Sequence, residues 1–478
     1  MSESMVSRDN RANIIFVKKG ECASPCEVLY SDGRNTATHS VSHSRDWSST
    51  ENNNNNAYKL NFSNGNSNNN NKNNSNNVRA VLAFEQYDLF HQPIPLSEFF
   101  QAYFDCRKKK RSTCSAIKFE VDYEQNLIEL ANEVNSGTYK PESSLAFIID
   151  KPVKREVFAA SFRDRIIHHL LINKINHLFE KVFIKDSYSC RVGKGTHYAI
   201  KRIDHFIRSC SENYTKDCYI LKLDIEGFFM HINRQLLYDK LLSFLDTEYN
   251  EVDKEIVLNL VRQIVFYEPT VGCRIKGDAA NWNGLPANKS LFCVQEGCGL
   301  PIGNLTSQVF ANFYMNEFDH FMKHDLGLQY YGRYVDDFVI IHRDKEYLKY
   351  LIPVISDFLN SRLHLTLHPR KIYLQHYSKG VKYLGVVVKP YRKYVANRTY
   401  GNMYERICEL NKIVEDNVPT KADKLLFRSS INSYLGIMRH YSTFNKCSAL
   451  MDSNLSLWWK KRIDFCENYH KITLNINV

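Results

Sequence analysis

The sequence predicts an α+β fold in which an antiparallel sheet is backed by helices. Its clearest local signal is a β-hairpin within residues 329–342, where two runs rich in aromatic and β-branched residues flank a short polar break. An apolar run at residues 219–223 leads into Asp224 and is typical of a strand that leaves the core at a carboxylate. Helical apolar spacing follows in residues 309–321 and over most of residues 391–478.

The polar break of the hairpin carries two adjacent acids, Asp336 and Asp337, within the run Tyr-Val-Asp-Asp-Phe. Two carboxylates held close together repel each other unless a positive charge lies between them, and a divalent cation would supply it. Asp-Asp in an exposed turn is also ordinary turn chemistry. The hairpin alone therefore leaves a metal site and a plain turn as equal alternatives.

Asp224 adds a third carboxylate at the end of another predicted strand, in the run Leu-Asp-Ile-Glu-Gly-Phe-Phe at residues 223–229. Three carboxylates on neighbouring strand ends, helped by the backbone carbonyl of Ile225, would hold two Mg²⁺ ions. Such a pair of ions activates an attacking hydroxyl and stabilises a leaving pyrophosphate. The three acids therefore predict nucleotidyl-transfer chemistry.

These motifs resemble those of the reverse transcriptases. Residues 223–229 are similar to the first palm motif of that family, and residues 334–338 are similar to its Tyr-x-Asp-Asp signature. Between them, Gly-Leu-Pro-Ile-Gly at residues 299–303 resembles the motif that faces the template and the nucleotide, where most bacterial and intron enzymes carry Gln at the position of Ile302. The resemblance implies a right-hand polymerase, with fingers, an antiparallel palm sheet and a helical thumb, that copies RNA into DNA.

The resemblance also implies roles for single residues. Asp224, Asp336 and Asp337 are the expected catalytic residues and metal ligands, with the carbonyl of Ile225 as a further ligand of the two Mg²⁺ ions. Lys371, in the run His-Pro-Arg-Lys, is the expected acid that protonates the departing pyrophosphate.

The incoming deoxynucleoside triphosphate (dNTP) and the template have their own expected contacts. Phe229 lies five residues after Asp224, where the family places the aromatic ring that blocks a ribose 2′-hydroxyl, and a core role is the alternative. Leu384 and Gly385 resemble the primer grip. The remaining residues expected to bind substrate are Ile302, Gly303, Arg163, Arg165 and Lys154.

One branch of the family is matched in more detail. Ile-Gly-Asn at residues 302–304, followed by Ser307 and Gln308, resembles the reverse transcriptases of diversity-generating retroelements, which copy a template RNA with errors at adenines. That type implies template RNA, cDNA, dNTPs and a small basic accessory protein as partners. A reverse transcriptase of antiviral defence would share every catalytic residue, whereas a non-catalytic RNA-binding protein is disfavoured because all three acids are present.

The N-terminal region is rich in Asn, with runs at residues 52–56 and 68–71, and its composition predicts a polar low-complexity segment without a core. Residues 46–82 also resemble the last strands of the lectin-like proteins that such retroelements diversify. Changing either adenine of the Asn codons AAC and AAT never creates a stop codon. Residues 46–82 are therefore a candidate template repeat read in frame, and a folded lectin fragment is the less favoured alternative.

Composition supports a nucleic-acid enzyme. The 478 residues are 44% hydrophobic, enough for a large core, and the net charge of +11 indicates a polyanionic partner. We expect a low-complexity region at residues 1–82, fingers and palm at 83–390, and a basic thumb at 391–478, where 14 Lys and Arg oppose 8 Asp and Glu. The absence of a membrane-spanning run or a secretory signal predicts a cytoplasmic protein, whose 13 cysteines we expect to be free thiols.

Two further segments have alternative interpretations. The basic cluster at residues 107–111, at the end of a predicted helix, is either a phosphate contact or a solvated helix end. Residues 186–195 form a turn-rich basic loop that resembles a fingers motif, and a plain surface loop is the alternative. Trp282, in the insertion before the Gly-Leu-Pro motif, is expected to pack on the palm in preference to stacking on a single strand.

Overall fold

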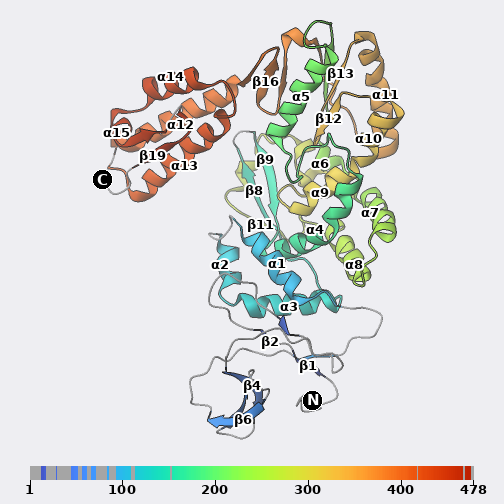
Figure 1. The fold of residues 1–478 in the computed structure, drawn as a ribbon, viewed down its shortest axis with the longest axis vertical. Helices are drawn as coiled ribbons and strands as arrows, with labels where there is room; N and C mark the ends of the chain where they lie inside the picture. The colour runs from blue at the N-terminus through green and yellow to red at the C-terminus, as the bar shows by residue number, and fades with distance from the viewer. Residues whose placement is uncertain are drawn as a thin grey trace. The chain divides into compact units, whose positions relative to one another are not determined.

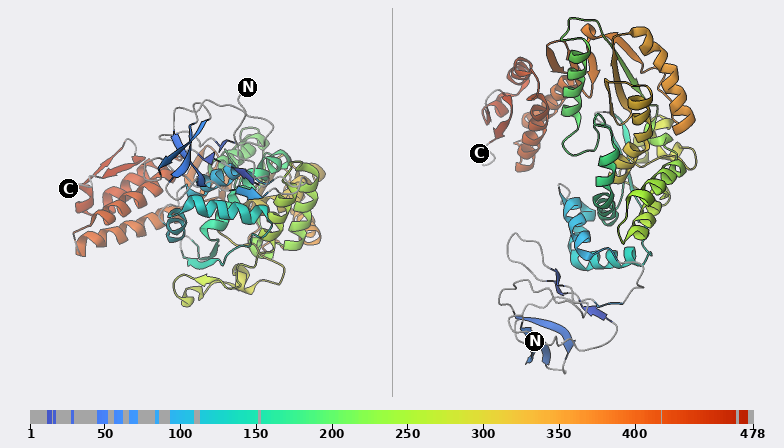
Figure 2. Two further views of the ribbon diagram at one scale, coloured as in Figure 1. Left: turned by 90° about the horizontal axis from the view of Figure 1, so that it is seen from below. Right: turned by 45° about the vertical axis from the view of Figure 1, so that its right-hand side comes forward.

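The computed structural model divides into two compact units, residues 1–101 with 251–256, and residues 102–250 with 257–478. It describes residues 93–108, 113–150, 153–416, 418–466 and 469–474. Before residue 93 it describes only the backbone of short strands, drawn in blue in Figures 1 and 2. These strands are β1 (Ala12–Ile14), β2 (Phe16–Val17), β3 (Val28–Leu29), β4 (Arg45–Glu51), β5 (Asn56–Asn61), β6 (Asn66–Asn71) and β7 (Ala83–Glu85).

The Asn-rich region contains a small sheet that its composition does not predict. Strand β5 pairs antiparallel with both β4 and β6. Backbone hydrogen bonds between strands do not depend on the side-chain type, so even an Asn-rich run can pair in this way. The other residues of the candidate template repeat lie outside the described residues.

The centre of the second unit is a four-stranded sheet in the order β12-β13-β10-β14. All three strand pairs are antiparallel, and β12 and β13 form the predicted hairpin with the two acids at its tip. The expectation of an antiparallel sheet with Asp224 at a strand end is confirmed. The strands are β10 (Tyr219–Asp224), β12 (Tyr331–Tyr334), β13 (Asp337–His342) and β14 (Tyr373–His376).

Helices cover both faces of this sheet, because its strands alternate buried residues to either side. On one face, Ile220, Val339 and Ile341 join a buried cluster with helix α5 (Thr196–Cys210). On the other face, Phe338 packs edge-on against Phe318 of α10, with ring centroids 5.2 Å apart. The predicted helix at 309–321 is divided near Met315 into α9 (Leu305–Tyr314) and α10 (Asn316–His320), which continues as the π-helical turn η4 (Phe321–Asp325).

A smaller sheet combines two strands that precede β10 in the chain with a third from the insertion that follows it. Its order is β11-β8-β9, with β8 and β9 antiparallel and β11 parallel to β8. The strands are β8 (Leu145–Ile149), β9 (Arg155–Ala159) and β11 (Arg274–Ile275). The helices up to this point are α1 (Leu96–Arg107), α2 (Cys114–Glu120), α3 (Tyr123–Asn135), α4 (Phe162–Val182), α6 (Phe228–His231), α7 (Arg234–Glu248) and α8 (Lys254–Val265).

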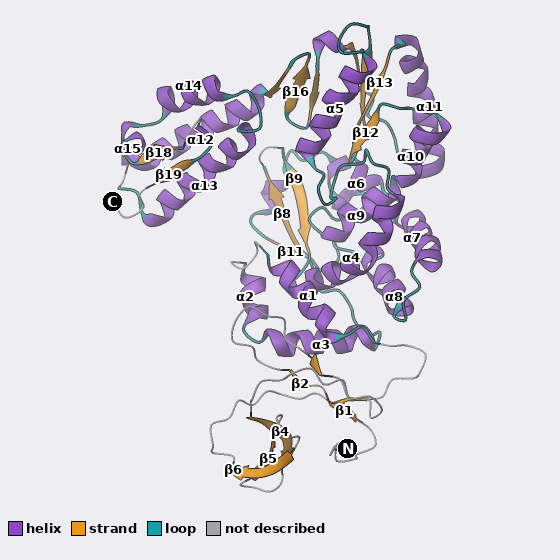
Figure 3. Cartoon of the chain, viewed as in Figure 1, coloured by secondary structure: helices purple, strands orange, loops and turns teal. Residues whose placement is uncertain are grey.

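The connections between the motifs contain shorter helical turns and one long helix. The insertion before the Gly-Leu-Pro motif forms three 3₁₀ turns. Helix α11 follows the β12–β13 hairpin (Figure 3). Within the described residues, no helix has both the length and the apolar character needed to cross a bilayer, and the cysteines are free thiols. These elements are η1 (Ala279–Trp282), η2 (Ala287–Lys289), η3 (Leu291–Cys293), α11 (Lys345–Leu363) and η5 (Tyr377–Lys379).

The C-terminal part has its own core, in which Trp459 stacks on Phe427 with ring centroids 4.0 Å apart. The expected boundary at residue 391 falls in the turn between two paired strands, so the helical part begins at α12. The elements are β15 (Val381–Tyr383), β16 (Val386–Lys389), β17 (Arg392–Val395), α12 (Asn397–Asp416), α13 (Lys421–Met438), α14 (Phe444–Asn454), α15 (Leu457–Lys460), β18 (Ile463–Phe465) and β19 (Ile472–Leu474).

Candidate active site

The structure brings the three predicted acids together at one end of the central sheet. Asp224, the last residue of β10, lies directly opposite Asp337, the first residue of β13. Asp336 occupies the turn between β12 and β13, and its backbone carbonyl accepts a hydrogen bond of 3.2 Å from the N–H of Ile225. The hairpin tip is therefore tied to the segment that follows Asp224.

Two lysines partly neutralise this group of acids. Lys222 Nζ lies 3.1 Å from Asp337 Oδ2, and Lys371 Nζ lies 2.8 Å from Asp224 Oδ1. Burial, followed by repulsion from Asp224, raises the pKa of Asp336 to about 6. Burial raises the pKa of Asp337 to about 7, although Lys222 acts in the opposite direction. The three carboxylates carry more negative charge than the two lysines beside them neutralise.

The donor set fits a divalent cation. Asp337 Oδ1 is buried and has no hydrogen-bond partner within the described structure, and carboxylate oxygens are the ligands that Mg²⁺ prefers. In the part of the chain that the structure describes, no three His, Cys, Asp or Glu side chains are gathered closely enough to hold a metal ion in this conformation. Each lysine-bound carboxylate would exchange its lysine for the cation.

Ile225, the expected backbone ligand, lies in a short continuation of the central sheet. It forms an isolated antiparallel bridge with Leu367, and its side chain is buried. The neighbouring carbonyl of Asp224 accepts a hydrogen bond of 2.8 Å from the N–H of His368. The segment that carries Lys371 is therefore fixed beside the segment that carries Asp224.

The Gly-Leu-Pro loop packs between α6 and β9. The N–H of Leu300 donates to the carbonyl of Phe229 at 2.8 Å, and the N–H of Phe158 donates to the carbonyl of Ile302 at 3.0 Å. The side chains of Phe229 and Ile302 are both half-buried against one apolar cluster. The structure thus brings these two expected nucleotide contacts together. The buried members of the cluster are Ala146, Phe158, Met230 and Leu291.

Gly303 is needed where this loop approaches β9 most closely. Its φ of +129° is in a region that residues with a side chain rarely adopt. An added Cβ would lie 2.9 Å from Val157 Cγ1 and 3.1 Å from the carbonyl oxygen of Phe158. A side chain at this position would push the loop away from the strand.

Residues 151–388 match the model of a protein family described as reverse transcriptase (RNA-dependent DNA polymerase). The chain is a member of the reverse transcriptase family. The expected α+β right-hand polymerase fold and the expected RNA-directed DNA polymerase are thereby confirmed. Reverse transcriptases use a template RNA and dNTPs and typically require a divalent metal.

Three proteins to which this reverse transcriptase is similar share only a low sequence identity with it. Protein YkfC of Escherichia coli (strain K12) is 22% identical over 291 residues, which cover 54% of this chain and 69% of YkfC. Apo telomerase from Candida tropicalis has a TM-score of 0.40 at 12% identity and covers 71% of this chain. Telomerase from Candida albicans in complex with a TWJ fragment of telomeric RNA has a TM-score of 0.37 at 11% identity and covers 70%. The chain spans 65% and 61% of these two telomerase chains.

The insertion of the reverse transcriptase is held by one buried acid, Glu156 of β9. Its carboxylate accepts hydrogen bonds from Trp282 Nε1 at 2.6 Å, from Ser290 Oγ at 2.7 Å and from the N–H of Leu291 at 2.6 Å. Trp282 also packs against the cluster beneath Phe229. The expected packing of Trp282 is confirmed, although its partner is β9 and the loop around it.

Two of the other residues expected to bind substrate, Lys154 and Arg163, contact other parts of the protein in this structure. Lys154 Nζ donates to the carbonyl of Asn283 at 2.7 Å, in the insertion. Arg163 forms an ion pair with Glu133 of α3, and its guanidinium lies 5.2 Å from the ring centroid of Tyr139. Burial lowers the pKa of Arg165, whose buried Nε has no partner in the described structure. Their roles in substrate binding stay predictions.

The first two residues of the basic cluster at residues 107–111 have local partners. Arg107 forms an ion pair with Glu120 at 2.7 Å, and Lys108 forms one with Asp105 at 2.7 Å. Residues 109–111 lie outside the described residues. The contact of this cluster with template phosphates stays a prediction.

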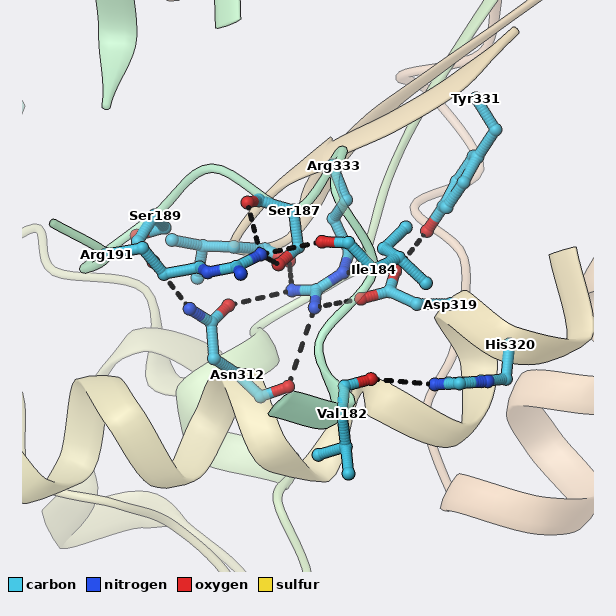
Figure 4. Close-up of polar contacts among 11 residues, drawn as sticks. Val182, Ile184, Ser187, Ser189, Arg191, Asn312, Asp319, His320, Tyr331 and Arg333 are labelled. Atoms are coloured by element: carbon cyan, nitrogen blue, oxygen red, sulfur yellow. Dashed lines mark hydrogen bonds and ion pairs between the residues drawn. The ribbon is translucent and has the colours of Figure 1, made fainter. Parts of the chain in front are cut away.

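Several residues beside the acids were missed by reasoning from the sequence. Lys222 could have been found, because residues two apart on a strand share a face and Lys222 precedes Asp224 by two positions. The other group is a buried polar network beneath the hairpin, formed by partners far apart in sequence (Figure 4). Its centre consists of Arg333, Asp319, Asn312 and Tyr331, and the loop at residues 186–191 packs beside it.

Proposed function

We propose that the protein copies a template RNA into cDNA, with two Mg²⁺ ions bound by Asp224, Asp336, Asp337 and the carbonyl of Ile225. The observation that carries this proposal is the pairing of Asp224 with Asp337 on adjacent strands, with Asp336 tied to the same strand end. When bound, the ions would activate the primer hydroxyl and stabilise the leaving pyrophosphate. The unpartnered Oδ1 of Asp337 supports this assignment.

Lysines would control protons and charge at this site. Lys371, whose side chain is about half exposed, already contacts Asp224 and is a cationic donor able to protonate the pyrophosphate. Lys222 is more enclosed and holds Asp337 from the side of the sheet. We therefore assign Lys371 to proton transfer and Lys222 to charge balance. Phe229, with Ile302 beside it, would contact the sugar and base of the incoming dNTP.

The type of reverse transcriptase is a finer proposal. Ile302 and the Asn-rich N-terminal region both favour a cytoplasmic enzyme of a diversity-generating retroelement, with its template RNA and a small basic accessory protein as partners. A reverse transcriptase of antiviral defence is the alternative. A copy of the codons for residues 46–82 in a neighbouring lectin-like gene would favour the retroelement, and a neighbourhood without such a copy would favour defence.

The catalytic assignment is tested by Asp336→Asn, which removes one charge with little change in volume. Primer extension with Mg²⁺ should fall by about 100-fold or more, as when an electrostatic stabiliser is removed from an active site, while RNA binding persists. Asp357→Asn, on the exposed face of α11, is the matched control and should extend primers normally. Wild-type extension by Asp336→Asn would overturn the metal assignment.

A further inference from the structure

The turn that carries the acids is strained. Val335 adopts a φ of +58°, in the left-handed region that β-branched residues rarely enter. Such a conformation is unfavourable and persists only where the surroundings enforce it. Here the carbonyl of Val335 accepts a hydrogen bond of 2.9 Å from Arg333 Nη1. The hairpin therefore holds its own tip through a side chain of the preceding strand.

Arg333 is itself anchored from below the sheet, as Figure 4 shows. It is fully buried, and its guanidinium binds both carboxylate oxygens of Asp319, at 2.8 and 2.6 Å. The same Nη1 atom that reaches Val335 also donates to Asn312 Oδ1 at 3.2 Å. Tyr331 adds a hydrogen bond of 2.6 Å to Asp319. Helices α9 and α10 thus fix the orientation of the guanidinium.

The backbone of Arg333 is held as firmly as its side chain. Its N–H donates to the carbonyl of Asp186 at 2.9 Å, and its carbonyl accepts from the N–H of Tyr188 at 3.0 Å. On the other side of the turn, the N–H of Ile225 donates to the carbonyl of Asp336. Both ends of the two-acid turn are therefore tied to separate parts of the fold.

A buried ion pair is a poor source of stability, because removing two charges from water offsets most of their attraction. The ion pair benefits the molecule through its geometry, because one side chain must reach several partners at once. The planar guanidinium can contact Asp319, Asn312 and Val335 together, whereas a lysine ammonium offers a single point charge.

We propose that Arg333 is a positioning residue that fixes the spacing of Asp336 and Asp337 relative to Asp224. This inference rests on the proposed function, because it takes these acids as the metal ligands. It predicts that the arginine acts on metal affinity and turnover through the turn, and that nucleotide affinity changes little.

The test compares Arg333→Lys with Arg234→Lys. Arg234 is a matched control because it is also buried, pairs with Glu268 at 2.7 Å and donates to the carbonyl of Tyr267 at 3.4 Å, but none of its described contacts reaches the hairpin turn or the loop at residues 186–191. Mn²⁺, which accepts the same oxygen ligands as Mg²⁺, is the probe, and its binding to the free protein is followed by electron paramagnetic resonance.

In Arg333→Lys we expect the Kd for Mn²⁺ to rise by about 10-fold or more, the size typical when a group that orients a metal ligand is lost. Turnover should fall as Mn²⁺ affinity falls, while the KM for dNTP stays within about twofold of wild type. This is expected because the lost interaction does not bind the dNTP in its ground state. Arg234→Lys should retain wild-type Mn²⁺ affinity. Adding Val335→Gly to Arg333→Lys should recover part of the affinity, because glycine adopts the turn without strain.

Unchanged Mn²⁺ affinity and turnover in Arg333→Lys would overturn the proposal, and so would equal losses in Arg234→Lys. Should Arg333→Lys not fold, Asn312→Ala replaces it, because Asn312 orients the same Nη1 atom while the ion pair remains. Unchanged Mn²⁺ affinity there would also overturn it. Failure of the proposed function is read separately, as normal primer extension by Asp336→Asn.

Discussion

The proposed contact of Ile302 with the incoming nucleotide would let a single side chain influence copying fidelity. Ile302 is half-buried beside Phe229, and its backbone is fixed by the hydrogen bond from Phe158. An apolar contact separates similar shapes by only about 1–3 kcal/mol, whereas a hydrogen-bonding group rejects a partner that leaves it unpaired. With this contact an isoleucine would favour loose discrimination between base pairs, and the alternative role is packing of the loop alone.

Ile302→Gln should lower the frequency of substitutions opposite template adenines by several-fold, because the amide adds a hydrogen-bonding group near the nascent pair. Sequencing of cDNA made by both enzymes on one template measures the change. Ile437→Gln, at an exposed position of α13, is the matched control. An unchanged error spectrum with normal activity would show that Ile302 serves only to pack the loop.

Asp164 makes stability depend on pH. Its carboxylate accepts hydrogen bonds from Tyr139 Oη at 2.9 Å, the N–H of Glu142 at 2.8 Å and Ser161 Oγ at 3.0 Å. Burial nevertheless raises its pKa from 3.8 to about 6. Because the folded state binds this proton more tightly than the unfolded state, the stabilisation is complete below pH 3.8 and is lost as the pH rises through 6.

Between pH 4 and 7 the wild type should therefore lose about 2 kcal/mol of unfolding free energy relative to Asp164→Asn, which has no proton to release. Asparagine directs an N–H toward donor groups, so the variant is less stable at every pH, and the measured quantity is the difference between the two pH profiles. Melting temperatures across this range provide it. Parallel profiles would contradict the pKa shift.

At the level of elements, short sequence patterns predicted the strands, because strand formation depends mainly on residues close together in the chain. The apolar run of β10 and the aromatic and β-branched runs of the hairpin identified the strands that carry Asp224 and Asp337, with Asp336 in the turn between them. The break near Met315 was missed, because the apolar spacing continues through it. Contacts between residues distant in sequence were also missed. No local pattern predicts that Arg163 pairs with Glu133, or that Glu156 accepts a hydrogen bond from Trp282.

The insertion offers a test of one such distant contact. Trp282→Phe keeps an aromatic ring on the cluster but removes one of the three hydrogen bonds to Glu156. We expect a loss of about 1–2 kcal/mol in unfolding free energy and a severalfold higher KM for dNTP, because the same cluster supports Phe229 and Ile302. Trp458→Phe, in α15, is the control for both measurements. A stable variant with unchanged KM would separate the insertion from the nucleotide site.

At the scale of the whole molecule, the Asn-rich region and the acids belong to different compact units. A chain lacking residues 1–82 should therefore retain at least about half of its primer extension when intact template RNA is supplied separately, since no described contact of the site involves those residues. Extension assays with and without added RNA measure this, with Asp336→Asn in the shortened chain as the inactive control. Activity that added RNA fails to restore would show that the segment acts as protein.

The strand order of the central sheet also determines when the candidate site can form during synthesis of the chain. Strand β10 is covered on one side by β13 and on the other by β14, both more than a hundred residues later in the chain. Contacts of such long sequence separation form slowly and late, and nascent chains acquire them only after the distant partner is synthesised. A ribosome that has passed Asp337 but not residue 376 has made all three acids without the second neighbour of the strand that carries Asp224. The sheet around Asp224 therefore cannot be completed before residue 376 has been synthesised, although all three acids are present earlier.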